Sequence, residues 1–158
     1  MKKDAASKNN AYTLIELLIG ISIISIIFSV GFASYRDFSR RQALTGVTKK
    51  IVSDLRTLQQ KALAGEKPAG CTTLDGYKVN ISSDSYSLYA DCSSDILIKT
   101  VDLIEDGATL TSTATNNTIT FKVLGQGTNL TSAVTITIYS SKIDKSSQVS
   151  IGIGGDIQ

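Results

Sequence analysis

One stretch decides how the chain is organised: Ala11-Tyr-Thr-Leu-Ile-Glu-Leu-Leu-Ile-Gly-Ile-Ser-Ile-Ile-Ser-Ile-Ile-Phe-Ser-Val-Gly-Phe-Ala33. From Leu17 to Ala33 it carries no charged side chain. A helix over residues 12–34 would be about 34 Å long, which is enough to cross a hydrocarbon core of roughly 30 Å. Glu16 stands at the start of the apolar run, where an unpaired carboxylate is unfavourable unless it lies near an interface. The stretch therefore predicts a membrane-spanning helix over residues 12–34.

Two common kinds of segment, a cleaved secretory signal and an ordinary signal-anchor, fit this stretch less well. A cleavable signal has an apolar core of about 7–15 residues followed by a small-residue cleavage site. Here the apolar run is longer, and no Ala-x-Ala pattern closes it. The small residue Ala11 instead precedes the run, after a leader that contains Lys2, Lys3 and Lys8. Cutting after Ala11 would leave the hydrophobic segment on the mature protein.

The nine residues Ala-Tyr-Thr-Leu-Ile-Glu-Leu-Leu-Ile at positions 11–19 resemble the prepilin signature of type IV pilins and type II secretion pseudopilins. The resemblance implies that a membrane aspartyl peptidase, the prepilin peptidase, cuts between Ala11 and Tyr12 and that Tyr12 is then N-methylated. It makes Glu16 the fifth mature residue, which would pair with the new amine of a neighbouring subunit during assembly. Ala11 and Tyr12 depart from the usual Gly and Phe but keep their size and character.

The resemblance, the apolar pattern and the distribution of charge together predict four segments and a membrane topology. These are a leader peptide at 1–11, a transmembrane helix at 12–34, its amphipathic continuation at 35–64 and an exported β-rich head at 65–158. Residues 35–64 contain seven basic and two acidic side chains, whereas residues 71–158 contain five basic and nine acidic ones. The basic leader beside the apolar run predicts a single pass through the cytoplasmic (inner) membrane, with the leader inside and the C-terminus exported.

Apolar residues recur at helical spacing through the segment 35–64, which predicts an amphipathic helix. Gly65 and Pro68 follow it as stop signals. We expect the stripe to pack on the chain's own sheet rather than on a coiled-coil partner. The basic residues at 36–41 could face lipid phosphates or solvent, and the sequence leaves both interpretations open. The stripe comprises Leu44, Val47, Ile51, Leu55, Leu58 and Ala62.

From residue 71 onward, apolar residues alternate with polar ones, as they do in strands with one buried face. The pattern predicts an α+β fold, in which the long N-terminal helix packs on a mostly antiparallel β domain, and the resemblance implies that this is a pilin-like fold. A stretch at 96–104 alternates less cleanly. The alternating segments are Tyr77-Val79-Ile81, Tyr86-Leu88-Ala90, Ile119-Phe121-Val123, Val134-Ile136-Ile138 and Val149-Ile151-Ile153.

The two cysteines, Cys71 and Cys92, fall in the part expected to be exported, so an even count in an oxidising compartment suggests a disulfide. Two free buried thiols are the alternative. The chain contains no histidine, and two cysteines are too few for a structural zinc site, so we expect neither a metal nor a cofactor. Glu105 and Asp106 lie in an expected turn and are interpreted as solvated. We therefore do not expect an enzyme.

The C-terminal part resembles the H-type minor pseudopilins of type II secretion and the related FimT-like minor pilins. The resemblance rests on the Ile119–Gly127 segment, an expected β pair at 133–140 and an expected final strand that ends with Ile151–Gln158. It implies a structural subunit of a secretion pseudopilus or type IV pilus for protein secretion. The implied partners are the membrane and other pilins or pseudopilins, which the chain would contact through its N-terminal helix.

A FimT-like DNA receptor for natural transformation is the alternative function. FimT-like proteins that bind DNA carry Gly-Arg-x-Arg in the terminal strand, whereas the matching stretch Gly154–Gln158 contains no arginine. Because cationic contacts to phosphate dominate DNA affinity and the head is net acidic, we do not expect the chain to bind DNA. An independent membrane-anchored binding domain that never assembles is a third possibility, but it leaves Glu16 without a role.

Overall fold

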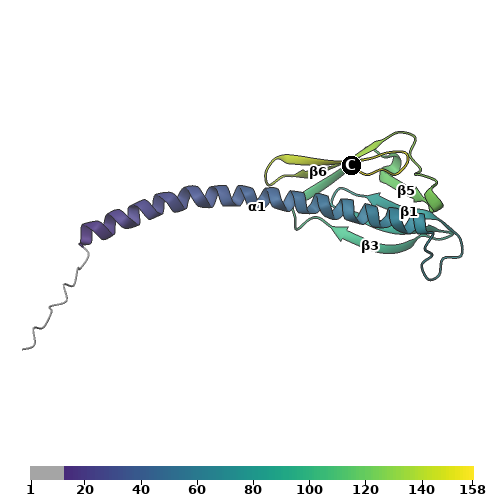
Figure 1. Cartoon of the computed structure of the whole chain (residues 1–158), viewed down its shortest axis with the longest axis horizontal. Coiled ribbons are helices and arrows are strands. Elements are labelled where there is room, and N and C mark those ends of the chain that lie inside the picture. The colour runs from purple at the N-terminus through teal and green to yellow at the C-terminus, as the bar shows by residue number, and fades with distance from the viewer. Residues whose placement is uncertain (1–12) are drawn as a thin grey trace, which may run out of the picture. The chain divides into compact units, whose positions relative to one another are not determined.

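A computed structural model describes residues 13–158 of the chain (Figure 1). It separates into two compact units, one ending at Phe38 and the other spanning Ser39–Gln158, and each is described by itself. The long helix α1, Leu14–Ala64, contributes to both units. Seven strands follow α1 in the second unit, so the predicted α+β class is confirmed.

Local hydrogen bonds explain both ends of α1. At the start, the Thr13 hydroxyl accepts the backbone N–H of Glu16 at 3.3 Å, which satisfies one of the unpaired donors of the first turn. At the end, Gly65 adopts φ 62°, and the N–H of Glu66 reaches back to the carbonyl of Lys61 at 3.2 Å. Together with a bond from Gly65 to Ala62, this forms a Schellman motif. The predicted stop at Gly65 is confirmed.

The first unit is a helix whose large apolar side chains are exposed, including Leu14, Ile15, Leu18, Ile24 and Phe28. Among the described residues, α1 is the one helix long and apolar enough to cross a membrane. Three serine hydroxyls in the run each donate to the carbonyl four residues earlier, at 2.7–2.8 Å. They therefore need no partner from outside the helix, which lowers the cost of placing them in lipid. These serines are Ser22, Ser25 and Ser29.

The second unit holds two antiparallel sheets. The four-stranded sheet has the order β3-β2-β1-β5, and the three-stranded sheet has the order β4-β6-β7. The strands are β1 Leu74–Ile81, β2 Ser85–Cys92, β3 Ile96–Asp102, β4 Ala108–Ser112, β5 Thr118–Lys122, β6 Val134–Ser140 and β7 Lys145–Ile151. Short 3₁₀ turns at Thr115–Asn117 and Val123–Gly125 flank β5.

The apolar stripe of α1 lies in the core of the second unit, in one cluster with buried residues from both sheets. All six predicted stripe residues are buried, and Leu55 and Leu58 are each only 1% exposed. They meet Tyr77, Ile119 and other inward-facing strand residues in one cluster. The expectation that the stripe packs on the chain's own sheets is therefore confirmed. Since burying each large apolar side chain contributes about 1.5–3 kcal/mol, this interface is a main source of the head's stability.

Three strand predictions need correction. β4 was not predicted, because only Ala108 and Leu110 of its five residues are apolar and its pairing with β6 supplies the rest. The segment 133–140 is not a β pair but contains one strand, β6, whose partners are β4 and β7. The last strand ends at Ile151. The chain then turns back, so that Ile157 bridges to Ile151 and Ile153 is exposed.

A polar contact joins α1 to the four-stranded sheet beside the apolar core. The Tyr86 hydroxyl donates to Asp54 Oδ2 at 2.7 Å, and Lys99 Nζ lies 2.9 Å from both oxygens of the same carboxylate. Burial raises the pKa of the Tyr86 phenol well above its usual value, and the hydrogen bond to Asp54 and that residue's charge raise it further. These bonds satisfy the partly buried carboxylate and fix the position of α1 along the sheet.

This contact predicts a pH dependence of stability. The unfolded chain ionises Tyr86 near pH 10, whereas the folded chain holds the proton, so the folded state is favoured less as the pH rises further. Above about pH 10 the free energy of unfolding should fall by up to about 1.4 kcal/mol per pH unit from this group. Urea unfolding of the full chain in detergent, compared with Tyr86→Phe, measures this contribution. Parallel pH profiles for the two proteins would contradict it.

Candidate functional site: the N-terminal assembly segment

The predicted cleavage site is not covered by the structure. Ala11 and Tyr12 lie outside the described residues, so both remain predictions from the sequence. The first residue that the structure describes is Thr13, the residue after Tyr12, and its hydroxyl caps α1. The Thr13-x-x-Glu16 spacing is typical of a helix start and is a signal in the sequence from which the start of α1 could have been predicted.

Glu16 lies in the first turn of α1 with its side chain exposed. Its neighbours Ile15, Leu17 and Leu18 are also exposed, so the carboxylate stands on an apolar helix surface. Within residues 13–158, no salt bridge or side-chain hydrogen bond involves the carboxylate of Glu16. A carboxylate at this position in lipid requires a partner or access to the interface. The described part of the chain supplies no such partner.

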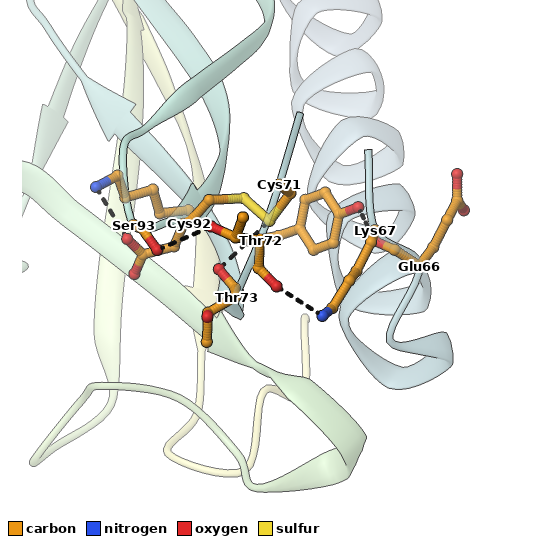
Figure 2. Close-up of a disulfide and its surroundings, with 10 residues drawn as sticks. Glu66, Lys67, Cys71, Thr72, Thr73, Cys92 and Ser93 are labelled. Carbon is orange, nitrogen blue, oxygen red and sulfur yellow. Dashed lines mark hydrogen bonds and ion pairs between the residues drawn. A yellow bond between two sulfur atoms is a disulfide. The ribbon is translucent and has the colours of Figure 1, made fainter. Parts of the chain in front are cut away.

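The predicted disulfide is present between Cys71 and Cys92, with 5.7 Å between the Cα atoms. Figure 2 shows it joining the segment after α1 to the end of β2. Around it, Lys67 Nζ donates to the carbonyl of Thr72 at 3.0 Å, and the hydroxyls of Thr72 and Ser93 lie 3.3 Å apart. Because the bridge spans 21 residues, it should stabilise the head by roughly 3 kcal/mol on the chain-entropy model. The bridge holds the α1–β1 connection on the sheet.

No catalytic arrangement is found in the described residues. A cavity of about 500 Å³ is lined by uncharged residues, among them Thr113, Asn116, Asn129 and Ser132, and contains no acid, base or nucleophile pair. Glu105 and Asp106 lie exposed in the turn after β3, as predicted. Residues 13–158 contain no group of three or more His, Cys, Asp or Glu side chains placed to hold a metal ion.

The C-terminal segment does not offer a cationic surface. Gly155 adopts φ 93° in a tight turn, and the Gly152 N–H donates to the carbonyl of Asp156 at 2.9 Å. The Gln59 amide of α1 donates to the carbonyl of Gly155 at 3.1 Å, which ties this turn to the helix. The one charged side chain between Gly152 and Gln158 is the acidic Asp156. This end of the chain therefore has no cationic side chain that could contact phosphate.

The N-terminal segment and the head together define a class: proteins with an apolar N-terminal helix, whose amphipathic continuation packs on a disulfide-bridged antiparallel β head. Residues 6–32 match the model of the prokaryotic N-terminal methylation motif. The chain is also 31% identical over 87 residues to Prepilin peptidase-dependent protein D of Escherichia coli (strain K12). That alignment covers 55% of this chain and 58% of the relative, so the chain spans less than two thirds of the relative's length. No solved structure matches the chain. Both matches support the resemblance of this chain to type IV pilins and pseudopilins.

Proposed function

We propose that the chain is a structural minor pilin or minor pseudopilin, which assembles into a type IV pilus or a type II secretion pseudopilus. A prepilin peptidase removes residues 1–11 by cutting between Ala11 and Tyr12, and Tyr12 becomes N-methylated. Residues 12–34 hold the subunit in the inner membrane, with the leader in the cytoplasm. Residues 35–64 and the head, 65–158, are exported. The head has a structural role, not an enzymatic one.

The observation that carries this proposal is the lone carboxylate of Glu16 on an apolar helix. Its partner, in our proposal, is the methylated amine of Tyr12 on a neighbouring subunit, so that the pair fixes the axial register of packed helices. Lipid supplies little hydrophobic drive for helix association, so packing and polar pairing decide the arrangement. The methylation motif and the name of the E. coli relative support the peptidase step.

Assembly tests the proposal in cells that contain a complete secretion or pilus machinery. After envelope cross-linking, the mature chain should migrate in high-mass species that also contain other pilins or pseudopilins. The same species should be absent from cells that lack the prepilin peptidase. If the mature chain forms no cross-linked species with any pilin, it behaves as an independent anchored domain and the proposal fails.

A DNA-receptor role is the competing function, because residues 35–64 are basic. We expect the purified segment 35–158 to bind duplex DNA only weakly at physiological salt, since residues 71–158 carry more acidic than basic side chains. Any residual binding should depend on the basic helix and weaken further in Arg56→Gln combined with Lys49→Gln. Fluorescence anisotropy at two salt concentrations measures this. Tight binding that survives both changes would favour the receptor function.

A further inference from the structure

The cavity of about 500 Å³ lies in the second unit, where the chain crosses between the two sheets. One wall belongs to residues 113–118, which lead from β4 into β5, and the other to residues 129–134, which lead into β6. β4 and β6 belong to one sheet, whereas β5 belongs to the other. Because ligand sites in proteins are commonly about 300–1,000 Å³ in volume, this space can hold a small organic molecule.

The chemistry of the lining restricts what the cavity can bind. Seven of the nine residues that line it carry a hydroxyl or a carboxamide group, and the other two, Leu130 and Val134, are apolar. None of the nine is charged, so an ionic ligand would lose hydration without gaining a counter-charge. An apolar ligand would cover polar groups and leave them unpaired, which is also unfavourable. The lining therefore favours a neutral ligand that both donates and accepts hydrogen bonds.

One wall of the cavity is held in place by hydrogen bonds of the chain itself. The hydroxyl of Thr128, which is 6% exposed, donates to the carbonyl of Ile153 at 2.8 Å and accepts the N–H of Leu130 at 3.2 Å. The N–H of Asn129 donates to the carbonyl of Thr120 at 3.0 Å, and Asn129 Oδ1 accepts the N–H of Thr120 at 2.8 Å. Since the oxygen of this carboxamide is engaged, the NH₂ group of Asn129 remains as a donor at a defined place.

The opposite wall supplies both donors and acceptors. The hydroxyl of Thr113 accepts the N–H of Thr135 at 2.9 Å, so its own hydrogen is left to donate. The hydroxyl of Thr118 donates to the carbonyl of Asn116 at 3.1 Å, so its lone pairs are left to accept. The exposed side chain of Asn116 makes no hydrogen bond to any of residues 13–158. The cavity thus combines donors and acceptors that are fixed in position with a side chain that is free to adapt.

We propose that this cavity binds a neutral carbohydrate. A sugar carries closely spaced hydroxyls that both donate and accept, and its C–H faces can pack on Leu130 and Val134. A peptide group offers one donor and one acceptor and would leave most of the lining unpaired. Because the chain already holds one wall in place, binding requires little ordering. The proposed function does not enter this inference, and either can fail without the other.

Saturation-transfer NMR on the full chain tests the proposal. The chain is kept in a phosphocholine detergent, which has no sugar head group, and is offered maltose, cellobiose and N,N′-diacetylchitobiose. We expect transfer to at least one of these neutral disaccharides. The matching disaccharide in which one CH₂OH group is oxidised to a carboxylate should bind about tenfold or more weakly. Transfer to none of the three, or equal binding of the acidic form, would overturn the proposal.

Longer sugars distinguish two sources of the same chemistry, a free sugar and a polysaccharide of the cell envelope. The disaccharide that binds is compared with its hexamer in the same experiment. Binding of the hexamer that is about tenfold or more tighter indicates a polysaccharide, because further sugar units then contact the head outside the cavity. Equal binding of the two indicates a free sugar.

Asn129→Asp is the most informative variant, because it keeps the oxygen that accepts the Thr120 N–H but replaces the NH₂ donor with a charged oxygen. It should weaken binding about tenfold or more. Asn80→Asp is the matched control, since Asn80 is exposed on β1 and does not line the cavity. A second variant, Thr131→Val with Ser132→Ala, removes two exposed hydroxyls of the lining and should also weaken binding about tenfold. Binding that is unchanged in both lining variants would overturn the proposal.

Discussion

Replacing Glu16 by alanine is expected to abolish assembly while membrane insertion and peptidase cleavage remain normal. If Glu16 pairs with the amine of Tyr12 on a neighbour, the alanine variant leaves that amine unpaired in a poorly solvated place. Removing one member of such a pair typically costs about 3–5 kcal/mol. Insertion itself should not suffer, because the desolvation cost of the carboxylate disappears. The variant should therefore be mature and membrane-bound, yet missing from cross-linked filament species.

Two further variants make this expectation specific to the charge of Glu16. Glu16→Gln keeps the shape of the side chain but loses its charge, so it should be nearly as defective as alanine. Glu66→Gln is the matched control, because Glu66 is an exposed acid that pairs with Lys61 at 2.7 Å within the head. An exposed pair of this kind contributes little, so this variant should assemble normally. Normal cross-linking by both Glu16 variants would remove the proposed role of Glu16.

The second large effect is expected at the cleavage site. Ala11→Glu should block processing, because the peptidase must accept a small residue before the cut. The full-length precursor should then accumulate in the membrane and be absent from assembled species. Immunoblotting with an antibody to the head detects the precursor and the mature form by size.

Ala11→Gly is the control for this change, since it restores the residue usual in prepilins. It should be processed at least as completely as the original chain. If Ala11→Glu matured normally, the cut between Ala11 and Tyr12 would be wrong, even if a cut elsewhere removed a leader.

The helix and its buried face could be predicted because each depends on local periodicity. The stripe from Leu44 to Ala62 repeats at helical spacing, and a helix with one apolar face must bury it. Gly65 marked the helix end because glycine has no Cβ and easily adopts the left-handed conformation that is common just after a helix. The disulfide followed from two cysteines in a part of the chain expected to be oxidised. The helix features are therefore encoded by neighbouring residues, whereas the disulfide was predicted from the number of cysteines and the expected compartment.

The features that the sequence did not predict depend on residues far apart in the chain. β4 is a strand because β6 offers it a partner and the core accepts Ala108 and Leu110. Nothing near Asp54 in the sequence indicates its partners, because Tyr86 and Lys99 reach it from two strands.

The mass of the mature chain is the most direct test of cleavage between Ala11 and Tyr12 and of the methylation of Tyr12. The protein is co-expressed with a prepilin peptidase, extracted from the membrane and analysed by intact-mass and N-terminal peptide mass spectrometry. We expect a chain that lacks residues 1–11 and begins with a methylated Tyr12. An intact N-terminus in the presence of active peptidase, or a mature chain that begins beyond the apolar run, would contradict it.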